Sequence, residues 1–356
     1  MISYKSGIVK SIINDEKDIT TVNVNVEGEV YKAVNYKDFT GEVNVEDEVV
    51  LNTTAVDLSL GTGGYHFIIY NHKNKTMELK GPGHIMKLRY TPYQMSCLVA
   101  EEEDSPYHHI FNDFKSLDNH IFIVATLHSM VAPIAAMIKY MNKDLRINYM
   151  MTDGGALPMA FSNTIRDLKG KEILDKTITV GHAFGGDLET INIYTGLIAA
   201  KEILKGDITI ISMGPGIVGS GTKYGFTGME QGYIIDAINN LGGLAVAVPR
   251  ISFKDLRERH KGISHHTITV LSQITNTKAN VVLPYLEEEK EDYLKEQIDK
   301  LNIKTRHNII FQDGEDIQKA MEMFNLKTSS MGRTIKDDID YFISLGAVGQ
   351  YVASLF

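Results

Sequence analysis

The chain has 356 residues, enough for two domains, and its 43% hydrophobic and 23% charged residues are typical of a globular protein. The formal net charge of -9 argues against a nucleic-acid or membrane-surface protein, because binding to either needs a surplus of positive charge. Cys97 is the single cysteine, which excludes an intrachain disulfide and a thiolate-rich metal site.

Two apolar segments bear on where the protein works. Residues 1–14 carry lysines at 5 and 10 and have no continuous apolar core, so they do not match a signal peptide. The longest apolar stretch, 121–141, is interrupted by His128, Ser129, Pro133 and Lys139 and is too polar for a membrane span. We therefore expect a cytoplasmic protein.

Residues 1–80 show the alternation of apolar and polar residues that predicts short β-strands. In 19–26, for example, Val22, Val24 and Val26 alternate with polar residues. Short strands joined by tight turns indicate a small antiparallel barrel or sandwich. We favour a packing or oligomerisation role for it over ligand binding, because its strands show neither an aromatic platform nor a basic stripe.

Glycine clusters at 61–64 and 81–83 mark a change in organisation, and we place the end of the first domain at residue 80. Residues 81–118 form a connecting segment that includes strands. Lys87 and Arg89 lie on the same face of one of these strands. That face could meet an anion, but we favour exposure to water.

From residue 119 to 356, short apolar runs alternate with helix-length amphipathic segments. We expect strands at 120–126, 146–151, 177–180, 207–213, 244–248, 279–283 and 308–311, with helices near 130–141, 157–168, 188–204, 228–240, 265–275 and 287–301. Strict alternation predicts a largely parallel sheet with helices on both faces. The fold class is therefore α/β, with a Rossmann-like three-layer domain after the barrel.

Polar residues follow successive strands of this predicted sheet, where all strand ends converge on one edge. They include His128, Asp153 and His182. We expect Asp153 and His182 to supply a catalytic base or metal ligands, with His128 assisting. Asp153, His182 and Asp187 would suit a divalent metal such as zinc, manganese or iron, although Asp187 could equally cap the helix that follows it.

The glycine-rich loop after the strand 207–213 contains Gly214, Gly216, Gly219 and Gly221 and formally spells G-x-G-x-x-G. A dinucleotide site needs a helix that begins within this turn. Thr227 and Glu230 instead have the spacing of a capping box, which places the helix start after a loop of about a dozen residues. The next strand ends in Pro249-Arg250 and not in the acid that would bind a ribose. We therefore expect the loop to wrap an anion with help from Lys223 or Arg250.

The densest polar segment lies at 249–267. It places Arg257, Arg259, His260, His265 and His266 within ten residues of one another, and Ser264 is a natural N-cap. Arg257, His265 and His266 would suit a phosphate or carboxylate at the start of a helix. A solvated surface turn is the alternative that the residues leave open.

Several segments together resemble a bacterial family described only as a domain of unknown function, number 3866. The segments are 61–65, 84–92, 152–158, 181–187, 214–232 and 249–267. The resemblance covers nearly the whole chain and implies a soluble bacterial protein, but it brings no mechanism with it.

We expect an enzyme, a hydrolase or transferase, that acts on a small anionic metabolite, with phosphorylated compounds as the favoured class. A sensor or scaffold that binds a nucleotide or metabolite without turnover is the first alternative, and an NAD(P)-dependent oxidoreductase is the second. Partners among nucleic acids and membranes are not expected, and a homodimer is the default for a soluble oligomer.

Overall fold

The computed structural model describes residues 1–60, 63–79 and 81–356. Gly61 and Thr62, which belong to the first segment of the resemblance, lie outside the described residues, as does Lys80 at the expected end of the first domain. Contacts within the described chain define two compact units. Unit 1 is Met1–Pro82 with Arg89–Gln94, and unit 2 is Gly83–Leu88 with Met95–Phe356.

Unit 1 is a closed barrel, as predicted, and the strand order through its described residues is β1-β2-β3-β5-β4. Alternate residues such as Val22, Val24 and Leu51 point inward and are fully buried. Strands β3 and β5 pair in parallel, and the other pairs are antiparallel. The elements are β1 (Tyr4–Asp15), β2 (Ile19–Val26), β3 (Glu29–Tyr36), α1 (Lys37–Thr40), β4 (Glu48–Asn52), α2 (Thr54–Asp57) and β5 (Tyr65–Asn71).

Unit 2 is built on a parallel sheet, which confirms the predicted α/β class. Over the described chain the sheet has eight strands in the order β11-β10-β9-β12-β8-β13-β16-β17. Its central strands are buried along their whole length because helices cover both faces. The strands are β8 (Ile121–Val124), β9 (Ile147–Thr152), β10 (Lys176–Val180), β11 (Leu188–Thr190), β12 (Ile208–Met213), β13 (Leu244–Ala247), β16 (Asn280–Pro284) and β17 (Asn308–Gln312).

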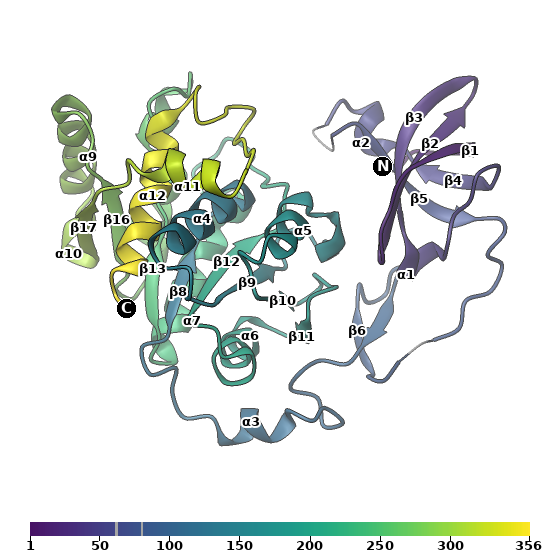
Figure 1. Ribbon diagram of the computed structural model, residues 1–356, viewed down its shortest axis with the longest axis horizontal. Helices are drawn as coiled ribbons and strands as arrows, with labels where there is room; N and C mark the ends of the chain where they lie inside the picture. Colours follow the sequence, from purple (N-terminus) through teal and green to yellow (C-terminus); the bar gives the residue numbers. More distant parts are fainter. Residues whose placement is uncertain (61–62, 80) are drawn as a thin grey trace. The chain divides into compact units, whose positions relative to one another are not determined.

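Each face of the sheet has its own layer of helices (Figure 1). One layer consists of α4 (Val131–Met141), α5 (Asn163–Gly170), α11 (Ile317–Met323) and α12 (Ile339–Ala353). The other consists of α6 (Ile193–Ile198) with a π-helical turn (Ala199–Leu204), α7 (Glu230–Asn240), α8 (His265–Thr269) with a π-helical turn (Val270–Ile274), α9 (Glu288–Lys300) and α10 (Ile303–Arg306).

Short elements complete unit 2. They are α3 (His108–Asp113), the strand pairs β6 (Ile85–Lys87) with β7 (Met95–Cys97) and β14 (Ile251–Ser252) with β15 (Gly262–Ile263), and 3-10 turns at His128–Met130, Met159–Phe161, Thr227–Met229 and Glu258–His260.

The strand order creates a switch point between β8 and β12, which are neighbours in the sheet. After β8 the chain passes through α4 to β9, on the far side of β12. After β12 it passes through α7 to β13, on the far side of β8. The loops that leave these two strands therefore diverge at the carboxyl edge of the sheet, and such a divergence opens the crevice where α/β proteins bind ligands.

The predicted helix at 188–204 is wrong at its start. Residues Leu188–Thr190 form the edge strand β11, and the helix begins at Ile193. Asp187 does not cap it, because Asn192 forms a capping box with Thr195. A segment of three residues with a single apolar side chain, Leu188, fits an edge strand as well as a helix, so periodicity could not separate the two.

The capping box expected from Thr227 and Glu230 does not form. Helix α7 has Met229 at its N-cap and no side-chain cap. Thr227 Oγ1 instead accepts a hydrogen bond from Val218 N at 3.1 Å, and Glu230 accepts one from Thr152 Oγ1 at 2.6 Å. Both side chains therefore form hydrogen bonds with residues outside the helix and not with the helix N-terminus.

Two further expectations need correction. The helix near 157–168 begins only at Asn163, because Ser162 is the N-cap and accepts a hydrogen bond from Ile165 N.

Lys87 does not face water; its side chain is 1% exposed and its Nζ lies 2.5 Å from both Glu189 Oε2 and Ala183 O. The partly buried carboxylate of Glu189 pairs with Lys87, which the sequence alone suggested was a surface lysine.

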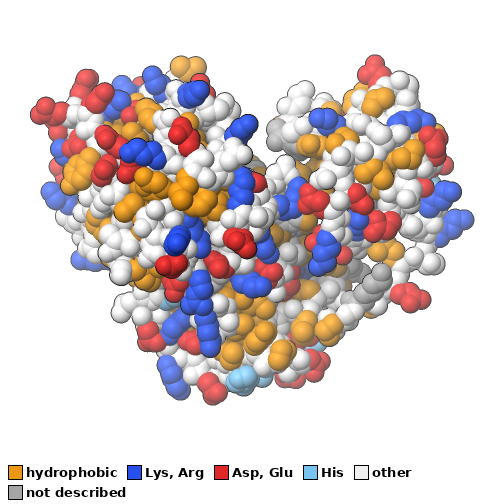
Figure 2. All heavy atoms as spheres, viewed as in Figure 1, with side chains coloured by type: hydrophobic (Ala, Val, Ile, Leu, Met, Phe, Trp, Pro, Cys, Tyr) orange, Lys and Arg blue, Asp and Glu red, His pale blue; other side chains and the backbone are white. Residues whose placement is uncertain are grey.

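Among the described helices, none combines the length and apolarity needed to cross a membrane. Viewed as in Figure 1, the surface of unit 2 carries acidic and basic side chains interspersed with one another (Figure 2). This mixture agrees with the modest net charge of -9.

Candidate functional site

Adjoining cavities lie where the loops after β8 and β12 diverge. The larger, about 380 Å³, we name the hydroxyl pocket; the smaller, about 220 Å³, we name the arginine pocket. Leu127, Ile217 and Met331 line both, so the cavities share a wall at the switch point. The hydroxyl pocket is lined further by His128, Ser129, Thr164, Pro215, Gly216, Lys327, Thr328, Ser329 and Ser330. The arginine pocket is lined further by Val218, Gly219, Gly221, Arg250, Arg257, Arg259, His260 and His266.

Asp255 organises the arginines of the smaller pocket. Arg257 donates to both of its carboxylate oxygens at 2.9 Å, and Arg250 Nη2 donates to Oδ2 at 2.8 Å. These hydrogen bonds, led by those from Arg257, hold the pKa of the Asp255 carboxyl well below its usual range despite its burial. Arg259 has no hydrogen-bond or ion-pair partner within the described part of the chain. One carboxylate therefore offsets only part of the positive charge that faces this cavity.

Arg250 also fixes the proton of His260. Its Nη1 lies 2.7 Å from His260 Nδ1, and a guanidinium can only donate. Nδ1 must then accept, which leaves the proton of the neutral ring on Nε2. Burial and the nearby charge of Arg250 lower the pKa of His260 to about 3, so the ring stays neutral. His260 thus presents an N–H group beside the arginines.

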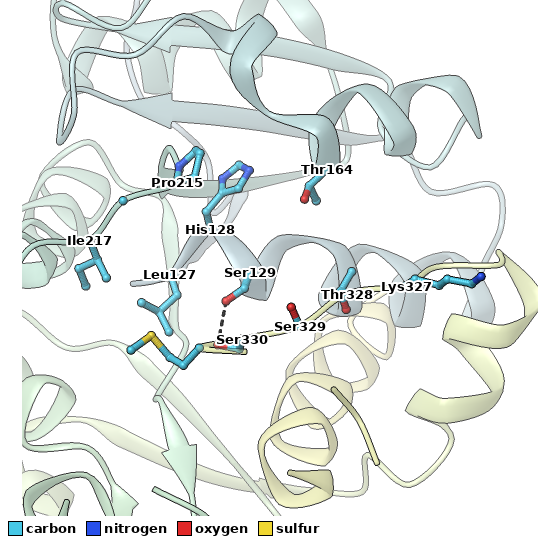
Figure 3. A pocket seen from close by; sticks show the side chains of 12 residues that line it. Leu127, His128, Ser129, Thr164, Pro215, Ile217, Lys327, Thr328, Ser329 and Ser330 are labelled. Carbon is cyan, nitrogen blue, oxygen red and sulfur yellow. Dashed lines mark hydrogen bonds between the residues drawn. The ribbon is translucent and has the colours of Figure 1, made fainter. Parts of the chain in front are cut away.

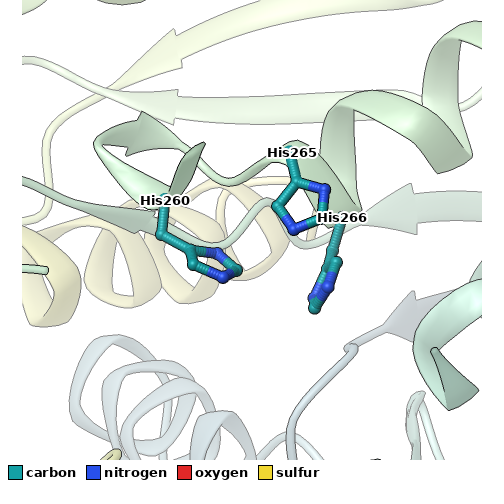
Figure 4. A group of neighbouring side chains, drawn as sticks. All are labelled: His260, His265 and His266. Atoms are coloured by element: carbon teal, nitrogen blue, oxygen red, sulfur yellow. The ribbon is translucent and has the colours of Figure 1, made fainter. Parts of the chain in front are cut away.

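His265 and His266 stand beside His260 at the start of α8 (Figure 4). Ser264 caps this helix, as predicted, by accepting a hydrogen bond from His266 N. The His266 ring stacks on Phe226, with centroids 4.0 Å apart. Burial, followed by the charges of neighbouring groups, lowers the pKa of His266 to about 4. A neutral His266 ring therefore faces the arginine pocket and can accept a proton.

The three imidazoles also form a group whose ligand atoms lie within 4.8 Å of one another, close enough for a metal ion. The surroundings argue against a cation. His260 uses its lone pair on Arg250, and Arg250, Arg257 and Arg259 all face the same cavity. The hydrogen-bond donors that face this cavity therefore fit an anion better than a metal ion. A further group, His84, Glu102 and Asp104, is mostly exposed, and Glu102 already accepts backbone hydrogen bonds from His84 and Val99.

The glycine loop contributes residues to both cavities. Gly216 lines the hydroxyl pocket, and Gly219 and Gly221 line the arginine pocket. Gly216 and Gly221 have φ values of 112° and 79°, and a Cβ at either position would project into open space. Gly214 packs instead against Leu157 and Met151. Residues 214–226 form a loop before the 3-10 turn at Thr227–Met229, so the loop of about a dozen residues is confirmed.

His128 lines the hydroxyl pocket, but both of its ring nitrogens are already engaged. Nδ1 lies 3.1 Å from Tyr149 Oη and Nε2 lies 2.7 Å from Ser162 Oγ. Tyr149 Oη donates in turn to the carbonyl of Ser212 at 3.2 Å. Burial lowers the pKa of His128 to about 4. His128 is therefore a neutral histidine that links the turn after β8 to β9 and, through Tyr149, to β12.

Asp153 and His182 lie close to one another but line neither pocket. A Cβ at Gly181 would lie 2.6 Å from Asp153 Oδ2, so this carboxylate rests against the residue before His182. His182 Nδ1 accepts a hydrogen bond from Leu88 N at 3.0 Å. Asp187 is held at the opposite end of β10, where Thr177 N and Lys169 Nζ each donate to it at 2.8 Å. The proposed metal ligands are therefore not gathered at one point.

Glu230 is a titratable residue that the sequence analysis treated only as a helix cap. Its carboxyl accepts a hydrogen bond from Thr152 Oγ1. Burial, opposed by that hydrogen bond and helped by Asp153, raises its pKa to about 7. No sequence signal distinguishes this role from capping, because the Thr-x-x-Glu spacing is the same in both.

Residues 327–331 were also missed as pocket residues. They follow α11 and form a wall of the hydroxyl pocket, and Ser330 Oγ accepts a hydrogen bond from Ser129 Oγ at 3.0 Å. Arg333 anchors this segment, since its Nε donates to Asp338 Oδ2 at 3.0 Å and its Nη2 lies 3.7 Å from Asp255. Local sequence could not place this segment beside the turn after β8, because Ser129 and Ser330 are about 200 residues apart in sequence.

Comparisons with known proteins add a family but no activity. A family model described as "Protein of unknown function (DUF3866)" matches residues 32–349. No curated protein matches the chain. A solved structure of pantoate-beta-alanine ligase from Francisella tularensis, complexed with beta-gamma ATP and beta-alanine, is similar at 14% identity. The match covers 58% of this chain and 78% of that one, and its TM-score of 0.14 is too low to support an argument.

Proposed function

Since the chain belongs to the protein family of unknown function DUF3866, which brings no activity with it, we propose a function from the site itself. The protein is an enzyme, a hydrolase or transferase, that binds a small phosphorylated metabolite. The phosphate occupies the arginine pocket at the switch point of the parallel sheet.

One observation carries this proposal: Arg250, Arg257 and Arg259 face a single cavity of about 220 Å³ together with His260 and His266. Guanidinium groups match the geometry of phosphate oxygens, and several of them around one cavity are typical of phosphate recognition. Asp255 holds Arg250 and Arg257 in place, and Arg259 keeps its donors available within the described structure. The glycine loop allows the ligand to approach the backbone closely.

The imidazoles supply the chemistry. His266 is neutral in the free protein, and the negative charge of a bound phosphate raises the pKa of the neighbouring imidazole. The ring can then take a proton from water in a hydrolysis, or from an acceptor hydroxyl in a transfer. The Nε2–H of His260 can donate to the charge that develops on the transferred phosphoryl group. In this proposal the new bond joins the attacking oxygen to phosphorus, and the bond to the leaving oxygen breaks. The proton of the attacking oxygen passes to His266, and the leaving oxygen takes a proton from water.

The oxidoreductase alternative loses support because helix α7 begins 16 residues after Gly214, and Arg250 follows β13 where a ribose-binding acid would stand. The sensor alternative uses the same pocket and differs only in the absence of turnover. A binding measurement and a turnover measurement therefore separate the remaining hypotheses.

The binding test is calorimetric titration of the protein with inorganic phosphate. Arg259→Gln should weaken binding about tenfold, because hydrogen bonds to charged groups contribute about 1.5–3 kcal/mol. Arg146→Gln is the matched control: it removes an exposed arginine that pairs with Asp207 before β9, away from the carboxyl edge. Equal affinities of the two variants would contradict the proposed phosphate site.

The turnover test is release of inorganic phosphate from a panel of phosphorylated metabolites, alone and with acceptor alcohols. His266→Asn should reduce the rate about a hundredfold while binding persists, since general-base catalysis typically contributes 10²–10⁴-fold. His72→Asn, which changes an exposed histidine of unit 1, is the control. Phosphate binding without turnover of any compound would support the sensor alternative instead.

A further inference from the structure

The hydroxyl pocket has no role in phosphate binding, yet it opens beside the arginine pocket. Leu127, Ile217 and Met331 line both cavities, so a ligand anchored by its phosphate among the arginines would extend into the larger cavity. A cavity of about 380 Å³ lies within the range of small-molecule sites. Its lining should therefore match the part of the metabolite that is not phosphate.

Five of the twelve described residues that line this pocket carry a side-chain hydroxyl. Figure 3 shows Ser129, Thr164, Ser329 and Thr328 around the space, contributed by the 3-10 turn after β8, by α5 and by the segment after α11. Ser129 is tied to Ser330 and to Tyr341 Oη at 3.0 and 3.1 Å. Thr164 and Ser329 have no hydrogen-bond partner in the described chain. Their hydroxyls can each donate and accept.

One polar atom of this wall is left without a partner by the protein. Thr328 Oγ1 is buried and makes no hydrogen bond with any described residue. Buried polar atoms normally have a partner, and an unpaired one costs roughly 1–3 kcal/mol. A bound hydroxyl group in the adjoining space could supply that partner after a small movement of the side chain.

The other residues that line the hydroxyl pocket indicate which chemical groups do not fit it. Among the lining residues that the structure describes, no Phe or Tyr is present, and the His128 ring nitrogens are engaged by Tyr149 and Ser162. Nucleobases are usually bound by stacking on aromatic side chains. Carboxylates are absent from the same lining, whereas Leu127, Pro215 and Ile217 give it apolar sides. Lys327, whose side chain is exposed, is the charged residue among the described lining residues. Hydroxyls between aliphatic walls suit a polar group that carries hydroxyls and is not planar.

We propose that the metabolite is a sugar phosphate or polyol phosphate, with its hydroxyl-bearing carbon chain in the hydroxyl pocket. This inference rests on the proposed phosphate site and adds the chemical class of the other half of the ligand. Thr164 and Ser329 bind ligand hydroxyls, and the arginine pocket binds the phosphate.

The experiment is calorimetric titration with inorganic phosphate, glucose 6-phosphate, glycerol 3-phosphate and adenosine 5′-monophosphate. We expect glucose 6-phosphate to bind at least about tenfold more tightly than inorganic phosphate, because two or more added hydrogen bonds each contribute severalfold. Thr164→Val and Ser329→Ala should each weaken glucose 6-phosphate binding about threefold to tenfold and leave inorganic phosphate binding unchanged. Thr76→Val, at an exposed threonine of unit 1, is the control.

The outcomes separate this inference from the proposed function. If inorganic phosphate binds but both sugar and polyol phosphates bind no more tightly, the phosphate site stands and the sugar inference fails. If adenosine 5′-monophosphate binds tenfold more tightly than glucose 6-phosphate, the hydroxyl pocket takes a nucleoside and the inference is overturned. If inorganic phosphate and all three esters fail to bind, both the proposed function and this inference fall.

Discussion

At the scale of single residues, His128 shows how a histidine beside a cavity can serve the fold. Its Nδ1 and Nε2 are shared between Tyr149 and Ser162, and Ser162 also caps α5. The folded protein holds this ring neutral, with a pKa of about 4 against an ordinary value of 6.5, because the site is buried. The unfolded chain therefore binds a proton more readily, and acid favours unfolding.

This linkage gives a prediction with a definite sign. The stabilisation associated with neutral His128 is complete above pH 6.5 and is lost as the pH falls toward 4. Between pH 7.5 and pH 5 it amounts to about 2 kcal/mol. Urea unfolding followed by circular dichroism should show that His128→Gln is less stable at pH 7.5 but loses about 2 kcal/mol less on acidification. His72→Gln should follow the parent protein, and an unchanged pH dependence in the His128 variant would refute the argument.

At the scale of elements, helix α12 contributes a packing surface that the sequence analysis did not predict. A Cβ at Gly349 would lie 2.6 Å from Met137 Cβ and 3.0 Å from the carbonyl oxygen of Ile134, both in α4. The two helices therefore approach so closely that only glycine fits at the contact. The apolar run in α12 lacks a clear polar face because the helix is buried nearly all round, which weakens its amphipathic signal.

Opposite effects of one substitution test this contact. An alanine in a helix is normally more stable than glycine by about 0.8–1.0 kcal/mol. At Gly170, the last residue of α5, a Cβ would meet no atom within 4 Å, so Gly170→Ala should stabilise unit 2 by up to about 1 kcal/mol. Gly349→Ala should destabilise it by about 1–3 kcal/mol, because the added methyl group overpacks the α4 contact. Thermal unfolding measures both, and stabilisation by Gly349→Ala would disprove the close approach.

The position of each site residue relative to the strands explains which parts of the site could be predicted from the sequence. Arg250, Arg257 and His266 come from one stretch that follows a strand, so local sequence already placed them together. The glycine loop could be added because parallel strands end at one edge. Asp153 and His182 also sit at that edge, yet they line neither pocket, because Asp153 rests against Gly181 and His182 Nδ1 accepts a hydrogen bond from Leu88 N. Strand order and the return of residues 327–331 depend on long-range contacts that no periodicity reveals.

At the scale of the whole molecule, an acidic chain concentrates positive charge at one site. The net charge is -9, but Arg250, Arg257 and Arg259 face one cavity in which Asp255 is the carboxylate that neutralises part of their charge. Net charge therefore predicts poor attraction for long polyanions, while the local field still favours a small anion. The fold class followed from the alternation of strands and helices, because that pattern is read locally.

The division into units leads to the last prediction. Unit 1 has its own barrel core, and unit 2 has apolar cores on both faces of its sheet. Every residue that lines the two pockets lies between 127 and 331, within unit 2. A fragment of residues 83–356 should therefore fold and bind inorganic phosphate within about threefold of the full chain, a difference of about 0.7 kcal/mol. Circular dichroism would confirm folding and calorimetry would measure binding, with Arg259→Gln weakening both proteins equally. A folded fragment that does not bind would show that the site needs residues of unit 1.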